Sequence, residues 1–272
     1  MLKAFFKAIS ITALLTACQS SPTVEQPAAE APLPEAKPAE VFFVPAEVAT
    51  ARSVKKAPKD IWERIRRQMT WQKIHNEKIG RARESYLQQP NYLTVVAARS
   101  EFYLYYIVEE VERRGLPIEL ALLPLVESTM NPFATSSESA AGLWQIMPAT
   151  GTHLGLEQDW WYDGRRDLRD STRAALDYLE MLHASFDDDW MLALAAYNSG
   201  KGRVLRAQKK SRQQGRPTDY WSLELPRETR KYVPRLIALS QIIAFPEAFD
   251  VEIPAVPNKP SFAVAATGGQ IE

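Results

Sequence analysis

The sequence predicts an all-α protein. Apolar residues recur at three- and four-residue spacing in the segments able to fold, which is the pattern of helices with one buried face. No stretch shows the regular alternation of apolar and polar residues that is typical of a half-exposed strand. The 272 residues are enough for one or two domains with a sizeable core, and no internal repeat is visible.

The first 17 residues are typical of a signal peptide. Lys3 and Lys7 give a basic start, and the apolar run 9–17 is too short to span a bilayer. The run ends at Cys18, the only cysteine of the chain, and residues 15–18 (Leu-Thr-Ala-Cys) resemble a bacterial lipobox. The sequence therefore predicts that Cys18 is lipidated and becomes the new N-terminus; an ordinary secretory signal with an incidental cysteine is the alternative.

Residues 18–58 are predicted to form a disordered tether. They are rich in Pro, Ala and Glu and nearly free of aromatic residues, so they cannot bury enough apolar surface to fold. Acyl chains on Cys18 would then supply the membrane anchor. Gln19, rather than an aspartate, follows the cysteine, which favours the outer membrane over the inner one.

Charge and composition exclude several classes of function. The 33 basic and 33 acidic residues balance, which argues against a general nucleic-acid binder. His75, His153 and His183 are far apart and show no metal-ligand spacing, so we expect no metal site and no cofactor.

Two helical segments precede the most informative part of the chain and are expected to form a helical extension, residues 59–115. Residues 60–89 carry apolar residues near helical spacing, and Pro90 breaks the pattern. A second helix is predicted over 93–114, ended by Gly115. Its expected core contacts are Phe102, Tyr105, Tyr106 and Val111.

The third predicted helix places one acid among apolar residues. Pro117 can open it, and Glu127 follows Leu123 by four residues and Leu120 by seven, so the three share one face. Burial and the helix C-terminus both disfavour a carboxylate, so its pKa should rise. A carboxylic acid still protonated near neutral pH can donate a proton to a leaving group. The alternative is a partly exposed terminal glutamate without a catalytic role.

The remaining elements follow from caps, prolines and aromatic clusters. After the polar loop 131–139, a short helix is predicted over 142–147, stopped at Pro148. Trp160, Trp161 and Tyr162 form a loop, either a sugar-stacking surface or a hydrophobic lid. The further expected segments are a helix to Phe186 capped by Ser171 or Asp170, a helix over 190–197 capped by Asp189, a basic helix over 201–214, a last helix from Pro226 to about 245, and an extended tail over 246–272.

Four sequence blocks then point to a family. They are Glu127-Ser128, Gly142-Leu-Trp-Gln-Ile-Met-Pro148, Ala195-Ala-Tyr-Asn-Ser-Gly200 and Glu228-Thr-Arg-Lys-Tyr-Val-Pro234. Together they resemble the soluble lytic transglycosylase family, and the sequence that flanks the four blocks resembles a membrane-bound branch of that family. The resemblance covers residues 60 to about 265 and implies a lysozyme-like helical catalytic domain at 116–245.

The resemblance implies cleavage of the β-1,4 bond between N-acetylmuramic acid and N-acetylglucosamine in peptidoglycan, with a 1,6-anhydromuramic acid end as product. Glu127 would be the catalytic acid. Gln145 and Tyr197 would hold the acetamido group and the sugar, and Asn198 would order the turn. Ser136 would orient the acid or the substrate. Tyr232 would hydrogen-bond the glutamate.

One position departs from the family pattern. Some relatives carry a second hydroxyl two residues after Ser136, where this chain has Glu138, which we expect to add a like charge near Glu127.

The resemblance also implies the partners. These are peptidoglycan strands and, through Cys18, the outer membrane, with the protein facing the periplasm as a monomer. Relatives of this branch often continue into small peptidoglycan-binding modules, so we expect wall targeting here to rest on the anchor and the catalytic groove. A hydrolytic goose-type lysozyme and a non-catalytic wall-binding scaffold are the alternative functions.

Overall fold

The computed structural model describes residues 58–262, all of which belong to one compact unit. The predicted signal peptide, nearly all of the predicted tether with Cys18, and residues 263–272 of the predicted tail lie outside the described residues.

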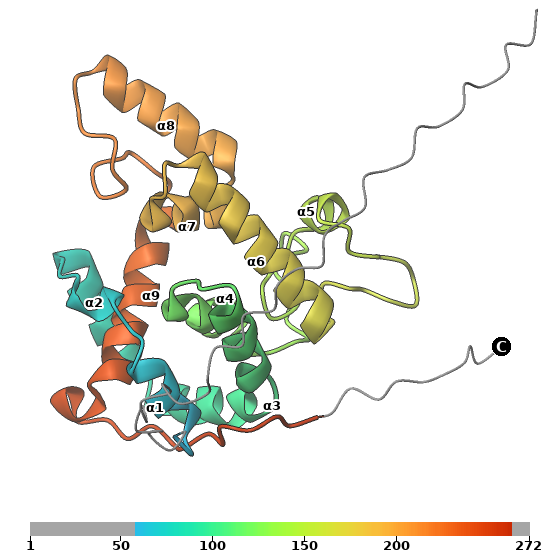
Figure 1. Ribbon diagram of the computed structural model, residues 1–272. Coiled ribbons are helices and arrows are strands. Elements are labelled where there is room, and N and C mark those ends of the chain that lie inside the picture. Colours follow the sequence, from blue (N-terminus) through green and yellow to red (C-terminus); the bar gives the residue numbers. More distant parts are fainter. Residues whose placement is uncertain (1–57, 263–272) are drawn as a thin grey trace, which may run out of the picture. The chain divides into compact units, whose positions relative to one another are not determined.

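The all-α prediction is confirmed for the described residues, which contain isolated β-bridges but no strand (Figure 1). The α-helices are α1 (Ile61–Arg66), α2 (Glu77–Leu87), α3 (Tyr92–Arg113), α4 (Leu123–Ser128), α5 (Pro148–His153), α6 (Leu168–Ser185), α7 (Trp190–Ser199), α8 (Lys201–Gln213) and α9 (Thr229–Ala244). The 3-10 turns are η1 (Trp71–Lys73), η2 (Ile118–Leu122) and η3 (Pro246–Phe249).

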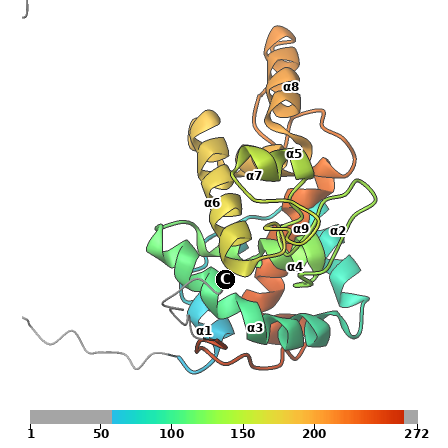
Figure 2. The same ribbon diagram turned by 90° about the vertical axis from the view of Figure 1, so that its right-hand side faces the viewer.

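Helix α9 is the centre of the core. Twelve of its 16 residues are buried, because α1, α2, α4, α7 and the 3-10 turns all pack against it. Figures 1 and 2 both show α2 alongside α9. Helix α6 packs on α3 and α7, and α7 also packs on α8. The helices expected to form an N-terminal extension therefore share a core with the residues that follow them.

The prediction of one continuous helix over 60–89 is wrong. The chain forms α1, η1 and α2 instead, and the break is held by a buried acid. Glu119 is fully buried, and its Oε1 accepts hydrogen bonds from the backbone N–H groups of Thr70 (2.5 Å) and Trp71 (2.6 Å). Asn76 then caps α2 by accepting from the Lys78 N–H. These long-range bonds satisfy N–H groups that local periodicity assigns to a helix.

The second predicted helix corresponds to α3 and ends at Gly115 as expected. Gly115 has a φ of +65°, its N–H bonds to the Glu112 carbonyl, and the Leu116 N–H bonds to Val111. This pair of bonds is a Schellman cap, which favours glycine at the left-handed position. Val111 is buried as predicted, whereas Phe102 is 57% exposed, so its expected core contact is wrong.

Two expectations around Pro148 and α6 are corrected. Residues 142–147 form a turn with single β-bridges, and Pro148 begins α5 rather than stopping a helix. Proline fits the first turn of a helix because its missing N–H has no intrahelical partner there. The cap of α6 is Asp167, whose Oδ1 accepts from the N–H groups of Arg169 and Asp170, not Ser171 or Asp170. Asp189 caps α7 as predicted.

The start of the predicted tail packs against α1. Val256 is buried, Asp60 and Pro257 form a β-bridge, and the Trp62 indole N–H donates to the Pro254 carbonyl at 3.0 Å. This segment joins the last described residues to the first ones.

Candidate active site

Glu127 lies in the last turn of α4. The helix predicted from Pro117 is divided into the 3-10 turn η2, which contains Leu120, and α4, which contains Leu123 and Glu127. Leu120 and Leu123 are fully buried, and Glu127 is partly buried at the edge of the core. The helix ends at once, because Thr129 and Met130 both have left-handed φ angles (+52° and +56°). The carboxyl group is therefore held by a short, buried helix at its C-terminal end.

The side chain of Tyr232 on α9 is the direct partner of Glu127. Tyr232 is 4% exposed, and its hydroxyl donates a hydrogen bond to Oε1 of Glu127. This is the hydrogen bond that the family resemblance implies. It crosses 105 positions in the sequence, so the α4–α9 contact is what brings the two groups together.

The electrostatic surroundings of Glu127 raise the pKa of its carboxyl group. Burial raises the pKa of its carboxyl to about 7. The Tyr232 hydrogen bond and the positive charge of Arg235 oppose this rise, and the negative charge of Glu228 adds to it. A carboxylic acid with a pKa near 7 can both donate and accept a proton at neutral pH.

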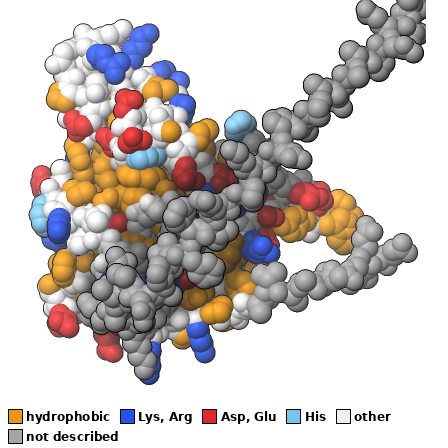
Figure 3. All heavy atoms as spheres, viewed as in Figure 1, with side chains coloured by type: hydrophobic (Ala, Val, Ile, Leu, Met, Phe, Trp, Pro, Cys, Tyr) orange, Lys and Arg blue, Asp and Glu red, His pale blue; other side chains and the backbone are white. Residues whose placement is uncertain are grey.

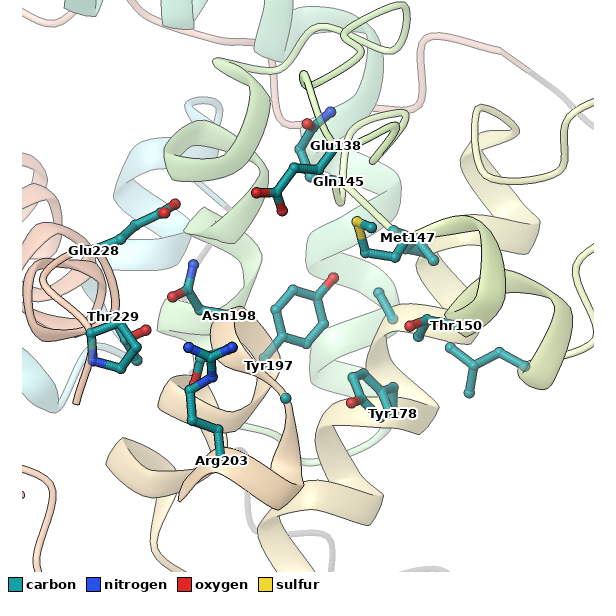
Figure 4. Close-up of a pocket in the computed structure, with 16 residues that line it drawn as sticks. Glu138, Gln145, Met147, Thr150, Tyr178, Tyr197, Asn198, Arg203, Glu228 and Thr229 are labelled. Carbon is teal, nitrogen blue, oxygen red and sulfur yellow. The ribbon is translucent and has the colours of Figure 1, made fainter. Parts of the chain in front are cut away.

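A cavity of about 410 Å³ lies among the helices that carry the other site residues (Figure 4). Its lining comes from the loop before α5, from α5, α6, the end of α7 and the start of α8, and from the segment that leads into α9. In Figure 4 the Tyr197 hydroxyl points toward the loop that carries Glu138 and Gln145, and Glu228 reaches in from the opposite side. Three of the predicted site residues line the cavity: Gln145, Tyr197 and Asn198.

Glu127 and Tyr232 do not themselves line this cavity, but they are coupled to it. Glu228 lines the cavity, and its charge acts on Glu127. The charge of Glu127 in turn raises the pKa of the Tyr197 phenol, which burial already raises. The cavity and the acid are thus parts of one site.

Gln145 is fixed by its own loop. Its φ is +47°, an unusual value for a residue other than glycine, and its side-chain Nε2 donates to the carbonyls of Gly142 (3.0 Å) and Ala134 (3.3 Å). Among the described residues, no group bonds to its side-chain oxygen. The amide is therefore held in place with its acceptor end available.

Tyr197 positions the same loop. Its hydroxyl donates to the carbonyl of Trp144 at 2.8 Å, and the buried Trp144 indole donates to Thr172 on α6 at 3.0 Å. Gly142 is required here, because its φ is +82° and a Cβ would lie 1.9 Å from the carbonyl oxygen of Arg165. The Gly-Leu-Trp-Gln block is thus a rigid turn clamped onto α6 and α7.

Ser136 makes its hydrogen bonds within its own loop. Its Oγ accepts the N–H groups of Glu138 and Ala140, which shapes the loop, and Ser136 lies outside the cavity lining. Glu138, which we expect to add a like charge near Glu127, is exposed and lines the cavity. Glu228 also lines the cavity, and its negative charge raises the pKa of Glu127.

Sequence reasoning gave no role to several residues at the site. Glu228 could have been found, because it precedes Tyr232 by four residues and so shares a helix face with it. Thr150, Tyr178 and Arg203 also line the cavity, and no local motif marks them. Within residues 58–262 no three His, Cys, Asp or Glu side chains gather as a metal site, and none of the helices is long and apolar enough to cross a membrane.

The exposed aromatic loop lies after α5. Trp160 and Trp161 are 80% and 78% exposed, with ring centroids 3.7 Å apart. Figure 3 shows hydrophobic side chains at the tip of this loop.

The chain is similar to several known proteins. The family model described as "Transglycosylase SLT domain" matches residues 105–219, which include Glu127, Gln145 and Tyr197. The chain is 42% identical over 213 residues to membrane-bound lytic murein transglycosylase D of Escherichia coli (strain K12), covering 78% of this chain and 47% of the relative. The chain thus spans about half the length of that curated relative.

A second relative is matched over most of its own length. A putative tributyltin chloride resistance protein of Alteromonas sp. (strain M-1) is 46% identical over 178 residues, covering 64% of this chain and 84% of that protein. Among solved structures, an inactive mutant of lytic transglycosylase Slt from Pseudomonas aeruginosa matches with a TM-score of 0.42 and 25% identity, over 57% of this chain and 26% of that one. The chain belongs to the transglycosylase SLT family, as the match to the SLT domain model and the extent of the sequence matches show.

Proposed function

We propose that the protein is a peptidoglycan lytic transglycosylase in cell-wall turnover or remodelling. It cleaves the β-1,4 bond between N-acetylmuramic acid and N-acetylglucosamine and leaves a 1,6-anhydromuramic acid end. The observation that carries the proposal is the partly buried Glu127, which is hydrogen-bonded by Tyr232 and has its pKa raised to about 7 beside a cavity. Family membership supports the same activity.

One carboxyl group is sufficient for this reaction if the substrate assists. The acetamido oxygen of the muramyl residue attacks its own anomeric carbon while Glu127 protonates the leaving glycosidic oxygen. The Glu127 carboxylate then accepts the proton of the muramyl 6-hydroxyl, whose oxygen attacks the anomeric carbon and displaces the acetamido oxygen. Glu127 ends protonated, as it began, and no water is consumed. A two-carboxylate glycosidase would need a second acid as nucleophile or base.

The cavity residues have matching roles in this scheme. The unbonded side-chain oxygen of Gln145 can accept the acetamido N–H, which would orient the acetamido oxygen toward the anomeric carbon. Tyr197 holds the Gln145 loop through the Trp144 carbonyl and adds an aromatic wall, and Asn198 lines the sugar site next to it. Ser136 acts indirectly, by shaping the loop that carries Glu138.

We further propose that the protein is a monomeric outer membrane lipoprotein facing the periplasm, anchored through Cys18. The lipobox-like residues 15–18 and the tether composition of 18–58 support this location. We also propose a division at residue 115, with the helical extension of 59–115 packed on the catalytic domain of 116–245.

The test is Glu127→Gln, which keeps shape and polarity but cannot donate a proton. Turnover of purified peptidoglycan should fall at least ~10²-fold, the usual scale of acid–base catalysis. The control is the circular dichroism melting curve, which should show a folded variant. Near-normal release of muropeptides by the folded variant would exclude Glu127 as the catalyst. Wild-type products with free reducing ends would favour a hydrolase, and wall binding without any products would favour a scaffold.

A further inference from the structure

A second groove, of about 650 Å³, lies between α2 and α9, and its ionisable walls are basic. Of the aspartates and glutamates in the described part of the chain, none lines it. The Lys and Arg side chains that line it are Lys78 and Arg81 of α2, and Arg227, Arg230, Lys231 and Arg235 at and within the start of α9. The six residues are exposed. We refer to this feature as the basic groove.

Most of these charges have no counter-ion among the residues that the structure describes. Arg81 pairs with Glu77 on its own helix. Within residues 58–262, no carboxylate lies within ion-pair distance of the other five. Like charges that face one another across a groove repel, so an anionic ligand would be bound favourably there.

The wall of the groove also holds an aromatic ring beside one of its arginines. Tyr86 lines the groove and is 6% exposed. The guanidinium of Arg235 lies 5.9 Å from the centre of the Tyr86 ring. The ring and the guanidinium together form one part of the groove wall.

The basic groove shares a wall with the catalytic cavity. Along residues 226–231, Pro226, Glu228 and Thr229 line the cavity, whereas Arg227, Arg230 and Lys231 line the groove. The next residue, Tyr232, bonds Glu127. The charge of Arg235, which lines the groove, also acts on Glu127. The catalytic cavity and the basic groove are therefore lined by neighbouring residues of one segment.

We propose that the basic groove binds the carboxylate groups of the peptide carried by the muramyl residue at the cleavage site. The inference rests on the proposed function. A peptidoglycan stem peptide is joined to muramic acid through its lactyl group and carries several carboxylates, and the segment 226–231 lines both the catalytic cavity and the basic groove. The substrate class is then the peptide-bearing strand rather than the bare glycan. A general polyanion fits less well, because the chain carries as many acidic as basic residues, 33 of each.

The test compares two substrates that differ only in the peptide: purified peptidoglycan, and the same glycan strands after removal of the peptides by an amidase. The variant is the double substitution Lys78→Glu with Arg230→Glu, one charge from each wall. The KM for peptide-bearing strands should rise roughly tenfold, while the KM for stripped strands and the melting temperature stay unchanged. Lys209→Glu, an exposed charge reversal on α8 away from the groove, is the matched control and should change neither KM.

A binding measurement makes the result independent of turnover. The Glu127→Gln protein is titrated with a peptide-bearing disaccharide and with the free disaccharide, with and without the groove substitutions. The proposal is supported if the groove substitutions weaken only the peptide-bearing ligand, even if no cleavage activity is found. It is overturned if the two ligands are affected equally or not at all. Loss of binding to vesicles of anionic phospholipid, with peptide binding unchanged, would also overturn it and assign the groove to a membrane surface.

Discussion

Replacing Tyr232 with phenylalanine isolates the interaction that sets the protonation of Glu127. The ring stays in the core, and only the hydroxyl that donates to Oε1 is lost. That hydrogen bond favours the carboxylate and so holds the pKa of Glu127 below the value that burial alone would give. The variant should therefore have a higher Glu127 pKa than the wild type.

The size of the shift follows from the strength of the bond. A hydrogen bond to a charged group contributes about 1.5–3 kcal/mol, and one pH unit corresponds to about 1.4 kcal/mol. Removing the bond should raise the pKa of Glu127 by roughly one to two pH units from its value of about 7. Because the first step requires the protonated acid, the wild-type rate should fall as the pH rises through about 7. In the variant this fall should occur at about pH 8 to 9.

The assay is the initial rate of muropeptide release across the pH range. The quantity compared is the midpoint of the alkaline limb, not the maximal rate, which other effects of the substitution can change. Tyr220→Phe is the matched control, because that buried phenol donates to the Thr229 carbonyl and touches no carboxylate. Its midpoint should equal that of the wild type. An unmoved midpoint for Tyr232→Phe would refute the assignment of the alkaline limb to Glu127.

Three further outcomes are expected. The folded-state pKa of Glu127, about 7, exceeds the ordinary value of 4.5, so the free energy of unfolding of the wild type should fall as the pH rises from 4.5 to 7. Glu127→Gln should remove about 1–3 kcal/mol of that fall, measured by urea unfolding, and identical pH profiles would count against a buried acid. Gly142→Ala should lower stability by at least about 2 kcal/mol, since its Cβ meets the Arg165 carbonyl, while Gly80→Ala, with open space around its Cβ, should be neutral or stabilising in thermal unfolding; equal melting temperatures would contradict the tight turn. Cys18→Ser should move the protein from the outer membrane fraction to the soluble periplasm, and continued membrane fractionation would mean another anchor.

The sequence allowed prediction of the helices whose signals are local. The glycine at 115 marked the end of α3, and the capping aspartate at 189 marked the start of α7. Glu127 could be singled out because its spacing to Leu120 and Leu123 is a property of one short segment. Its pairing with Tyr232 came from the family resemblance, because no local pattern links positions 105 residues apart.

The failures have tertiary causes. The helix over 60–89 is interrupted because Glu119, 49 residues away from Thr70, supplies a carboxylate to its N–H groups. Residues 142–147 form a turn instead of a helix because Tyr197 and Arg165 hold their backbone from other segments. Glu228 and Arg203 line the cavity because of the way α7, α8 and α9 pack together, and the spacing of apolar residues along the sequence does not predict that packing.

The chemistry of the new glycan end tests the central claim most directly. Purified glycan strands are digested in heavy-oxygen water, and the ends are analysed by mass spectrometry, with de-N-acetylated strands as a second substrate. The account predicts 1,6-anhydromuramic ends without heavy oxygen from acetylated strands, and no cleavage of strands that lack the 2-acetyl group. Efficient cleavage of de-N-acetylated strands, with heavy oxygen at the new reducing end, would contradict it and indicate a hydrolase with a second carboxylate, for which Glu228 is the first candidate by its place in the cavity.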